Sequence, residues 1–152
     1  MNIRDIEMKP FSVLDEEWAL VTAGVRDKFN SMTISWGSFG MIWYKPVISI
    51  YIRKSRYTFE LIEKEDYFTV SLYPNEFKDD MKILGSKSGR DCDKLSETKL
   101  KPNYISDNII TYEGAKITYV CKKLHIQDIL EGTNTIEDNN HMLIMAEVVD
   151  IK

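Results

Sequence analysis

The amino-acid sequence predicts a mainly β protein, an antiparallel barrel or sandwich with two or three short helices. Three observations support this: six runs of strand length dominate the chain, helical patterns are few, and strands and helices do not alternate regularly as in a doubly wound α/β sheet. The chain has 152 residues, 43% of them hydrophobic, without a recognisable linker, repeat or low-complexity tract. We therefore expect one domain over residues 1–152.

The first two strand signals form a pair. Residues 18–25 are rich in apolar and β-branched side chains, and residues 30–36 alternate with period two. The short polar connection between them predicts a hairpin, although it lacks an Asn-Gly or Asp-Gly turn.

A glycine-punctuated aromatic segment follows the second strand, and we expect it to be a loop. Its aromatic side chains are Trp36, Phe39, Trp43 and Tyr44. They either fill the core, which is the ordinary role of aromatic residues, or form the wall of a site for a planar ligand.

Four further strands are expected. Residues 47–52 are almost continuously apolar, which suits a strand covered on both faces, and residues 67–73 alternate cleanly. Residues 115–126 and 141–151 supply two longer strands. The last is apolar on both faces, which predicts that its outer side is covered, for example by a second subunit.

Two segments have helical patterns. Residues 58–66 begin with a threonine that can cap the helix, and residues 75–85 begin with an asparagine and end on a glycine. A shorter helical turn is expected around residues 91–96. These helices are insertions between strands and do not change the mainly β class.

Charge and composition exclude several classes of function. The 20 basic and 24 acidic residues give a net charge of −4, which argues against general nucleic-acid binding. No signal peptide is recognisable at the start and no apolar run is long enough to span a membrane, so we expect a soluble, cytoplasmic protein. Cys92 and Cys121 lack the spacing of metal ligands and are interpreted as free thiols in a reducing compartment.

The sequence also lacks the short motifs of several common sites. It contains no GxGxxG, GxxxxGK[ST], HExxH or GxSxG pattern, so a Rossmann nucleotide site, a P-loop, a zincin site and a nucleophile elbow are unsupported. His125 and His141 are the two histidines, and neither has a partner that would make a catalytic constellation. From the residues alone, a structural or surface role is expected for both, and no metal site is predicted.

The most informative segment for binding is RKSRYT at residues 53–58. It follows a strand and opens a helix, whose unpaired N–H groups and dipole favour an anion. Its side chains can complete such a site, with cations from Arg53, Lys54 and Arg56 and hydroxyls from Ser55 and Thr58. The alternative is a solvated basic turn with a capping threonine.

A second basic loop, GSKSGR at residues 85–90, has the composition of a backbone nest for an anion. An ordinary loop that ends a helix explains the same residues equally simply.

Four motifs in this order resemble the flavin reductase-like family of FMN-binding split-barrel proteins. They are NSMTISW at 30–36, KPVISIYIRKSRYT at 45–58, GSKSGRDCDK at 85–94 and HMLIMAEV at 141–148. The resemblance extends over about residues 18–149. It implies a six-stranded antiparallel split barrel of Greek-key topology, usually a homodimer, with FMN near the subunit interface.

The resemblance also implies roles for individual residues. Those expected beside the isoalloxazine ring are Asn30, Ser31, Met32, Thr33, Ser35 and Trp36. Those expected around the phosphate are Arg53, Ser55, Arg56 and Thr58, with Tyr57 close to the flavin. The loop at the same end contributes Ser86, Lys87, Ser88 and Gly89, and His141 matches a catalytic histidine near the nicotinamide or flavin ring.

The implied function is that of an FMN-dependent oxidoreductase. It would take hydride from NAD(P)H as a transient substrate and pass electrons to a flavin, a ferric complex or a protein acceptor. The alternative is an electron carrier of the flavoredoxin type, reduced by a partner protein. A third interpretation is a split-barrel module that binds another phosphorylated ring or no ligand.

Overall fold

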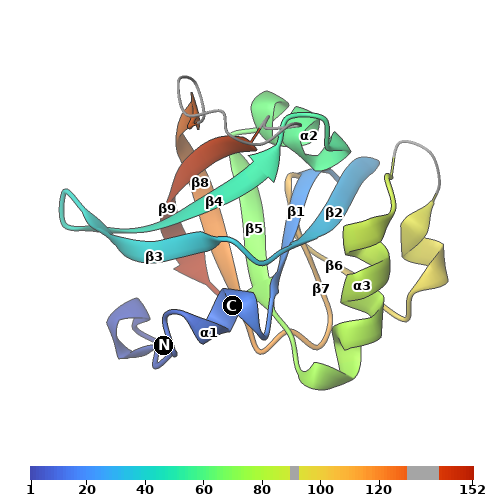
Figure 1. Cartoon of the computed structure of the whole chain (residues 1–152), viewed down its shortest axis with the longest axis horizontal. Coiled ribbons are helices and arrows are strands. Elements are labelled where there is room, and N and C mark those ends of the chain that lie inside the picture. The colour runs from blue at the N-terminus through green and yellow to red at the C-terminus, as the bar shows by residue number, and fades with distance from the viewer. Residues whose placement is uncertain (90–92, 130–140) are drawn as a thin grey trace.

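A seven-stranded antiparallel sheet forms the body of the molecule (Figure 1). The computed structural model describes residues 1–89, 93–129 and 141–152. The sheet has the order β2-β1-β5-β8-β9-β4-β3. Its strands are β1 (Ala19–Val25), β2 (Lys28–Ile34), β3 (Gly37–Ile42), β4 (Lys45–Arg53), β5 (Tyr67–Leu72), β8 (Ile117–Asp128) and β9 (His141–Ile151).

A two-stranded ribbon and three helices complete the described part of the chain. The ribbon consists of β6 (Pro102–Ser106) and β7 (Ile109–Tyr112). The helices are α1 (Ser12–Asp15), α2 (Tyr57–Lys64) and α3 (Lys78–Ser86). Short 3-10 turns are η1 (Ile3–Asp5), η2 (Asn75–Phe77) and η3 (Lys94–Glu97).

The mainly β class and all six predicted strands are confirmed, but the count of six is wrong. The main sheet contains a seventh strand, β3, in the segment predicted to be a loop. Trp43 and Tyr44 make the tight turn to β4, with φ angles of 49° and 62°. Tight β-hairpin turns need such positive φ values, which Asn-Gly usually supplies, so the sequence carried no turn signal here. Among the described strands, no pairing joins β2 to β3, so the hydrogen-bonded order stays open.

The helix starts also differ from expectation. The cap position of α2 is Arg56, without a side-chain cap bond, and Thr58 lies fully buried one turn into the helix. The second helix begins with the 3-10 turn η2 and continues as α3, and Asn75 gives no cap bond there. The turn expected around residues 91–96 corresponds in its described part to η3, while residues 90–92 lie outside the described residues.

Two apolar clusters lie on opposite faces of β1. The larger one fills the space between the curved sheet and α2, with Ile50, Phe59 and Ile144 among its fully buried members. The smaller one, with Leu20, Met81 and Tyr112, packs α3 and the β6–β7 ribbon against the outer face. This arrangement brings the ends of α2 and α3 to β2, the edge strand where the candidate site lies.

Candidate functional site

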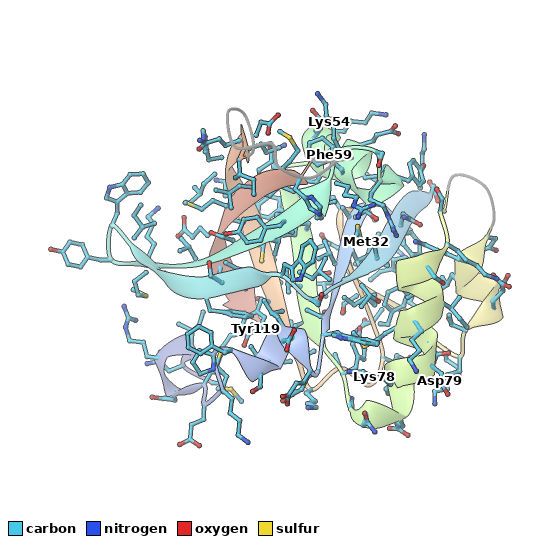
Figure 2. The ribbon with its side chains drawn as sticks, in the orientation of Figure 1. Met32, Lys54, Phe59, Lys78, Asp79 and Tyr119 are labelled. Atoms are coloured by element: carbon cyan, nitrogen blue, oxygen red, sulfur yellow. The ribbon has the colours of Figure 1, made fainter. Side chains whose placement is uncertain are left out.

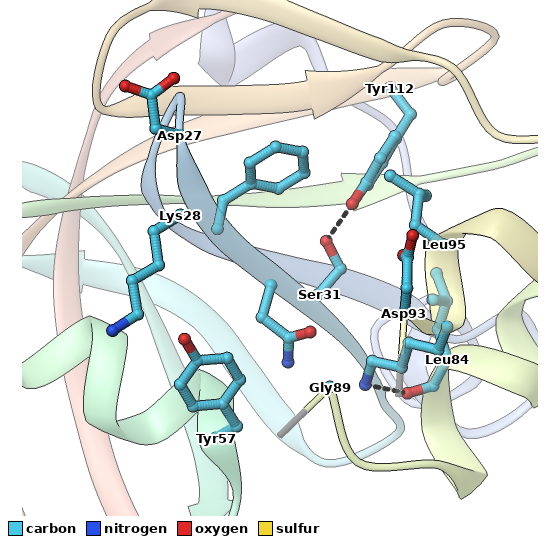
Figure 3. A pocket seen from close by; sticks show the side chains of 12 residues that line it. Asp27, Lys28, Ser31, Tyr57, Leu84, Gly89, Asp93, Leu95 and Tyr112 are labelled. Carbon is cyan, nitrogen blue, oxygen red and sulfur yellow. Dashed lines mark hydrogen bonds between the residues drawn. The ribbon is translucent and has the colours of Figure 1, made fainter. Parts of the chain in front are cut away.

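Two neighbouring hollows lie along β2. The basic hollow, with a volume of 350 Å³, is lined by Met32, Thr33, Ile34, Ser35, Trp36, Tyr51, Arg53, Ser55, Arg56, Gly85 and His141. The hydroxyl hollow, with a volume of 480 Å³, is lined by Asp27, Lys28, Phe29, Asn30, Ser31, Tyr57, Leu84, Gly89, Asp93, Lys94, Leu95 and Tyr112 (Figure 3). Successive residues of β2, and of the turn before α2, line both. The two hollows therefore form one elongated site, the β2 site.

Arg56 is the central cation of the basic hollow. Its Nη1 donates to the carbonyl oxygen of Gly85 at 3.1 Å, which connects the start of α2 to the end of α3. Its Nη2 is buried and has no hydrogen-bond partner among the described residues. Burial lowers the pKa of Arg56, and the neighbouring charge of Arg53 lowers it further. An anion in this hollow would relieve both effects, because it supplies an acceptor and an opposite charge.

Lys94 is a buried cation that the sequence analysis did not single out. Only 3% of this residue is exposed, and its Nζ donates to the carbonyl oxygens of Leu84 and Lys87 at 2.9 and 3.0 Å. It lines the hydroxyl hollow, beside Asp93 and Leu95 (Figure 3). The residue lies inside the motif at 85–94, but nothing in the spacing indicated that this lysine would be buried.

Asn30 and Thr58 connect β2 to α2. The Asn30 Nδ2 donates to Thr58 Oγ1 at 2.9 Å, and both residues are buried. Gly89 packs so closely on this pair that an added Cβ would lie 2.0 Å from Asn30 Oδ1. Any larger residue at 89 would displace the Asn30 side chain, so the glycine is required by close packing.

Ser31 and Thr33 use their hydroxyls within the protein. The Ser31 hydroxyl lies 2.7 Å from that of Thr22 and 2.5 Å from that of Tyr112, and this last pair spans the floor of the hydroxyl hollow (Figure 3). Burial raises the pKa of Tyr112, so its phenol stays protonated. Thr33 Oγ1 donates to the carbonyl oxygen of Met81 at 2.5 Å. These bonds fix β2 against β7 and α3.

His141 lies in the basic hollow, as the resemblance implied. It pairs with Arg53 across the β4–β9 ladder, and its ring lies 5.2 Å from that of Trp36, at an interplanar angle of 48°. Trp36 is 56% exposed, so this side of the hollow opens to solvent. A planar group entering the hollow would meet two rings and a cationic end.

The structure brings most of the predicted site residues together, but not all of them. Eight of them line the basic hollow: Met32, Thr33, Ser35, Trp36, Arg53, Ser55, Arg56 and His141. Asn30, Ser31, Tyr57 and Gly89 line the hydroxyl hollow. Thr58, Ser86, Lys87 and Ser88 line neither one.

The remaining candidates lie elsewhere. Lys87 pairs with Glu97 at 2.6 Å on the surface. Lys54 is exposed and lies at the outside of the β4–α2 turn (Figure 2). His125 is exposed beside Gln127, in agreement with a surface role. Cys121 is a buried free thiol of the core, whereas Arg90 and Cys92 lie outside the described residues.

Two kinds of site are absent from the described part of the chain. No group of His, Cys, Asp and Glu side chains within residues 1–89, 93–129 and 141–152 is arranged to hold a metal ion. Within the same ranges, no helix is both long and apolar enough to cross a membrane.

The β2 site suits an anionic ligand with a flat ring. Cations and helix N–H groups gather at one end, and aromatic rings stand at the open side. Residues 14–152 match a family model described as the flavin reductase like domain. No curated protein matches the chain significantly.

Several solved structures share this fold. An FMN-binding protein from Thermus thermophilus, with bound p-hydroxybenzaldehyde, is 23% identical with a TM-score of 0.73, over 100% of this chain and 79% of that one. Flavoredoxin of Desulfovibrio vulgaris (Miyazaki F) is 21% identical with a TM-score of 0.71, over 100% and 75%. The styrene monooxygenase flavin reductase from Pseudomonas putida S12 is 15% identical with a TM-score of 0.66, over 90% and 79%.

Proposed function

The chain belongs to the flavin reductase-like domain family, and we propose that it binds FMN in the β2 site and uses it as an NAD(P)H-dependent oxidoreductase. Electrons would pass to a flavin, a ferric complex or a protein acceptor. The strand order supports a split-barrel interpretation, because β5 lies between the β1–β2 and β8–β9 hairpins. The observation that carries the proposal is the buried Nη2 of Arg56, which lacks an acceptor among the described residues.

The residues of the β2 site fit a phosphorylated ring. A phosphate oxygen is the acceptor that a guanidinium N–H binds best, and the basic hollow adds Arg53 and the hydroxyl of Ser55. Lys94 supplies a second buried cation from the neighbouring hydroxyl hollow. The first N–H groups of α2 add donors without side chains.

Bound FMN would supply the reversible transfer of hydride and electrons. The chain's own part is to bind and orient. The β2 residues from Met32 to Trp36 and the ring of His141 border the basic hollow, and the half-exposed Trp36 leaves one side accessible. Because the sequence has no Rossmann motif, the nicotinamide would have to stack transiently at this open side, where His141 can orient it.

An absorption spectrum from 300 to about 550 nm, the general flavin range, tests the proposal. The purified protein is examined before and after anaerobic addition of NADH or NADPH. We expect flavin bands that bleach promptly with one of the two nucleotides. A colourless protein that takes up no added FMN would overturn the flavin assignment itself.

The similarity to flavoredoxin favours a second candidate, an electron carrier reduced by a partner protein. The substitution His141→Ala separates the two. In a reductase, bleaching by nicotinamide nucleotide slows while FMN stays bound, because the histidine borders the open side of the hollow. In a carrier, the wild type itself bleaches poorly and the substitution changes nothing.

A further inference from the structure

The β3–β4 hairpin ends in an exposed aromatic arm, which we define as residues 41–44. Met41 is 54% exposed, Trp43 72% and Tyr44 96%. Figure 1 shows the hairpin projecting beyond the rest of the sheet. Trp43 and Tyr44 both have left-handed backbone conformations, which bulky side chains rarely adopt. Folding of this chain alone gives no reason to place two strained aromatic residues in water.

An apolar groove lies at the base of the same hairpin. This N-terminal groove has a volume of 690 Å³ and is lined by Ile3, Arg4, Ile6, Met8, Pro10, Phe11, Gly37, Ser38, Phe39, Gly40, Met41, Pro46, Val47, Ile48, Tyr119 and Val148. Arg4 is the one charged side chain of that lining. At the rim, Phe11 is 92% exposed. The groove therefore offers an apolar surface next to the arm, at the end of the sheet where the N-terminal segment lies beside β3 (Figure 1).

Tyr119 indicates what kind of molecule the groove accepts. It lines the groove near the N-terminal segment (Figure 2), and its hydroxyl is buried without a hydrogen-bond partner among the described residues. Leaving a buried hydroxyl unpaired is unfavourable, so an occupant with polar groups along an apolar surface fits better than a hydrocarbon. A polypeptide segment with aromatic side chains has this combination.

We propose that the aromatic arm of one copy of this chain docks in the N-terminal groove of a second copy. Arm and groove share β3, so a two-fold axis beside this strand can seat both arms at once. The outer edge of β3 has no strand partner among the described residues, and an exposed edge of this kind favours association.

The exposed area is sufficient for a stable dimer. An aromatic side chain buries about 150–250 Å² when it is fully covered, so two aromatics per arm and the surfaces they cover would bury about 1,300 Å² in total. This lies within the range of about 1,200–2,000 Å² for specific protein interfaces. The proposal depends on these surfaces alone and not on the proposed flavin chemistry.

Sedimentation equilibrium of the full chain tests the proposal. We expect a dimer for the wild type and a dissociation constant at least about 100-fold higher for the double variant Trp43→Ser/Tyr44→Ser, because both anchors are lost. The matched control is Leu124→Ser. Leu124 is also an exposed apolar residue, but it lies on β8 outside arm and groove, so this variant should associate like the wild type.

A second variant changes the groove instead of the arm. A Cβ added at Gly40 meets no atom within 4 Å, so Gly40→Trp fits its own chain and fills part of the groove. We expect it to weaken association while its thermal unfolding stays close to that of the wild type.

Two results overturn the proposal. One is a monomeric wild type at tens of micromolar; the other is a dissociation constant unchanged in both the arm and the groove variants. FMN uptake is measured in parallel for each protein. A dimer that binds no flavin contradicts the proposed function only, and a flavin-binding monomer contradicts the arm proposal only.

Discussion

Two regions of this protein bury polar side chains, and they satisfy them in different ways. Beneath the β6–β7 ribbon, the hydroxyls of Ser71, Thr111 and Thr118 form a triangle with sides of 2.8, 2.9 and 3.0 Å. In the β2 site, Arg56 keeps a buried Nη2 without an acceptor among the described residues. Buried polar groups normally have partners inside the protein, and the triangle follows this rule. The guanidinium departs from it, which is the pattern expected where the partner is a ligand.

Lys94 is intermediate between these regions, and substituting it tests the comparison most severely. Its ammonium group is bound to two carbonyl oxygens but also lines the hydroxyl hollow. Lys94→Met removes charged hydrogen bonds worth about 1.5–3 kcal/mol each, so we expect a loss of about 3 kcal/mol in unfolding free energy. If Lys94 also faces the ligand, FMN affinity falls as well. Urea unfolding and flavin titration of the same variant measure the two effects.

A variant with weaker FMN binding but wild-type stability would show that the two carbonyl bonds contribute little. Lys87→Met is the matched control, because Lys87 forms an exposed ion pair and lines neither hollow. Exposed pairs of this kind contribute at most about 1 kcal/mol.

Arg56→Ala should affect ligand binding more than folding. The lost contact is a charge-assisted hydrogen bond to phosphate, so we expect FMN binding to weaken by about 1.5–3 kcal/mol, or roughly 10- to 150-fold. Fluorescence titration of the apoprotein with FMN measures it. Lys54→Ala is the control, since Lys54 is an exposed cation of the same turn that does not line the hollow. Equal affinities in the two variants would contradict the phosphate assignment.

The sequence predicted the site better where chemistry is local. The cations Arg53 and Arg56 follow directly after a strand, and the structure places both in one hollow. Thr58 was expected at the phosphate, but its hydroxyl accepts from Asn30, a residue 28 positions away. Lys94 was missed for the same reason, because its burial depends on α3 and on the packing of η3. No local pattern encodes such long-range contacts.

The same limit explains the strands that the sequence did not reveal. In β3, glycines and aromatics read as a loop, and pairing with β4 decides the outcome. The ribbon β6–β7 is short, and its residues gain stability only by packing on β1 and β5. The longer, strongly patterned strands carried enough local signal to be predicted.

The hydroxyl triangle gives the opposite expectation to Arg56. Thr118→Val keeps the shape of the side chain but leaves the hydroxyls of Ser71 and Thr111 with one partner fewer. We expect the unfolding free energy to fall by about 1–2 kcal/mol, measured by urea unfolding, with unchanged FMN affinity. A change in affinity without a change in stability would show that the triangle is not the closed, structural region described above.

Cys121 extends the comparison to pH, with the smallest expected effect. The thiol is buried in the core and lines neither hollow, and burial raises its pKa. Above the ordinary thiol pKa of about 8.5, the unfolded chain loses this proton while the folded chain retains it. The unfolded state then binds fewer protons, so stability falls as pH rises, by up to about 1.4 kcal/mol per pH unit.

Urea unfolding of the wild type and of Cys121→Ala between about pH 8.5 and 10 measures this slope. The window ends there because burial also raises the pKa of Tyr73 and Tyr112, whose unfolded phenols ionise from about pH 10. The variant loses core volume and starts from a lower stability, so the comparison is between slopes and not between absolute values. Parallel slopes would contradict the assignment of this pH dependence to Cys121. FMN affinity should not share the Cys121 contribution, because that group is enclosed by the protein alone, whereas the donors of the β2 site are left to the ligand.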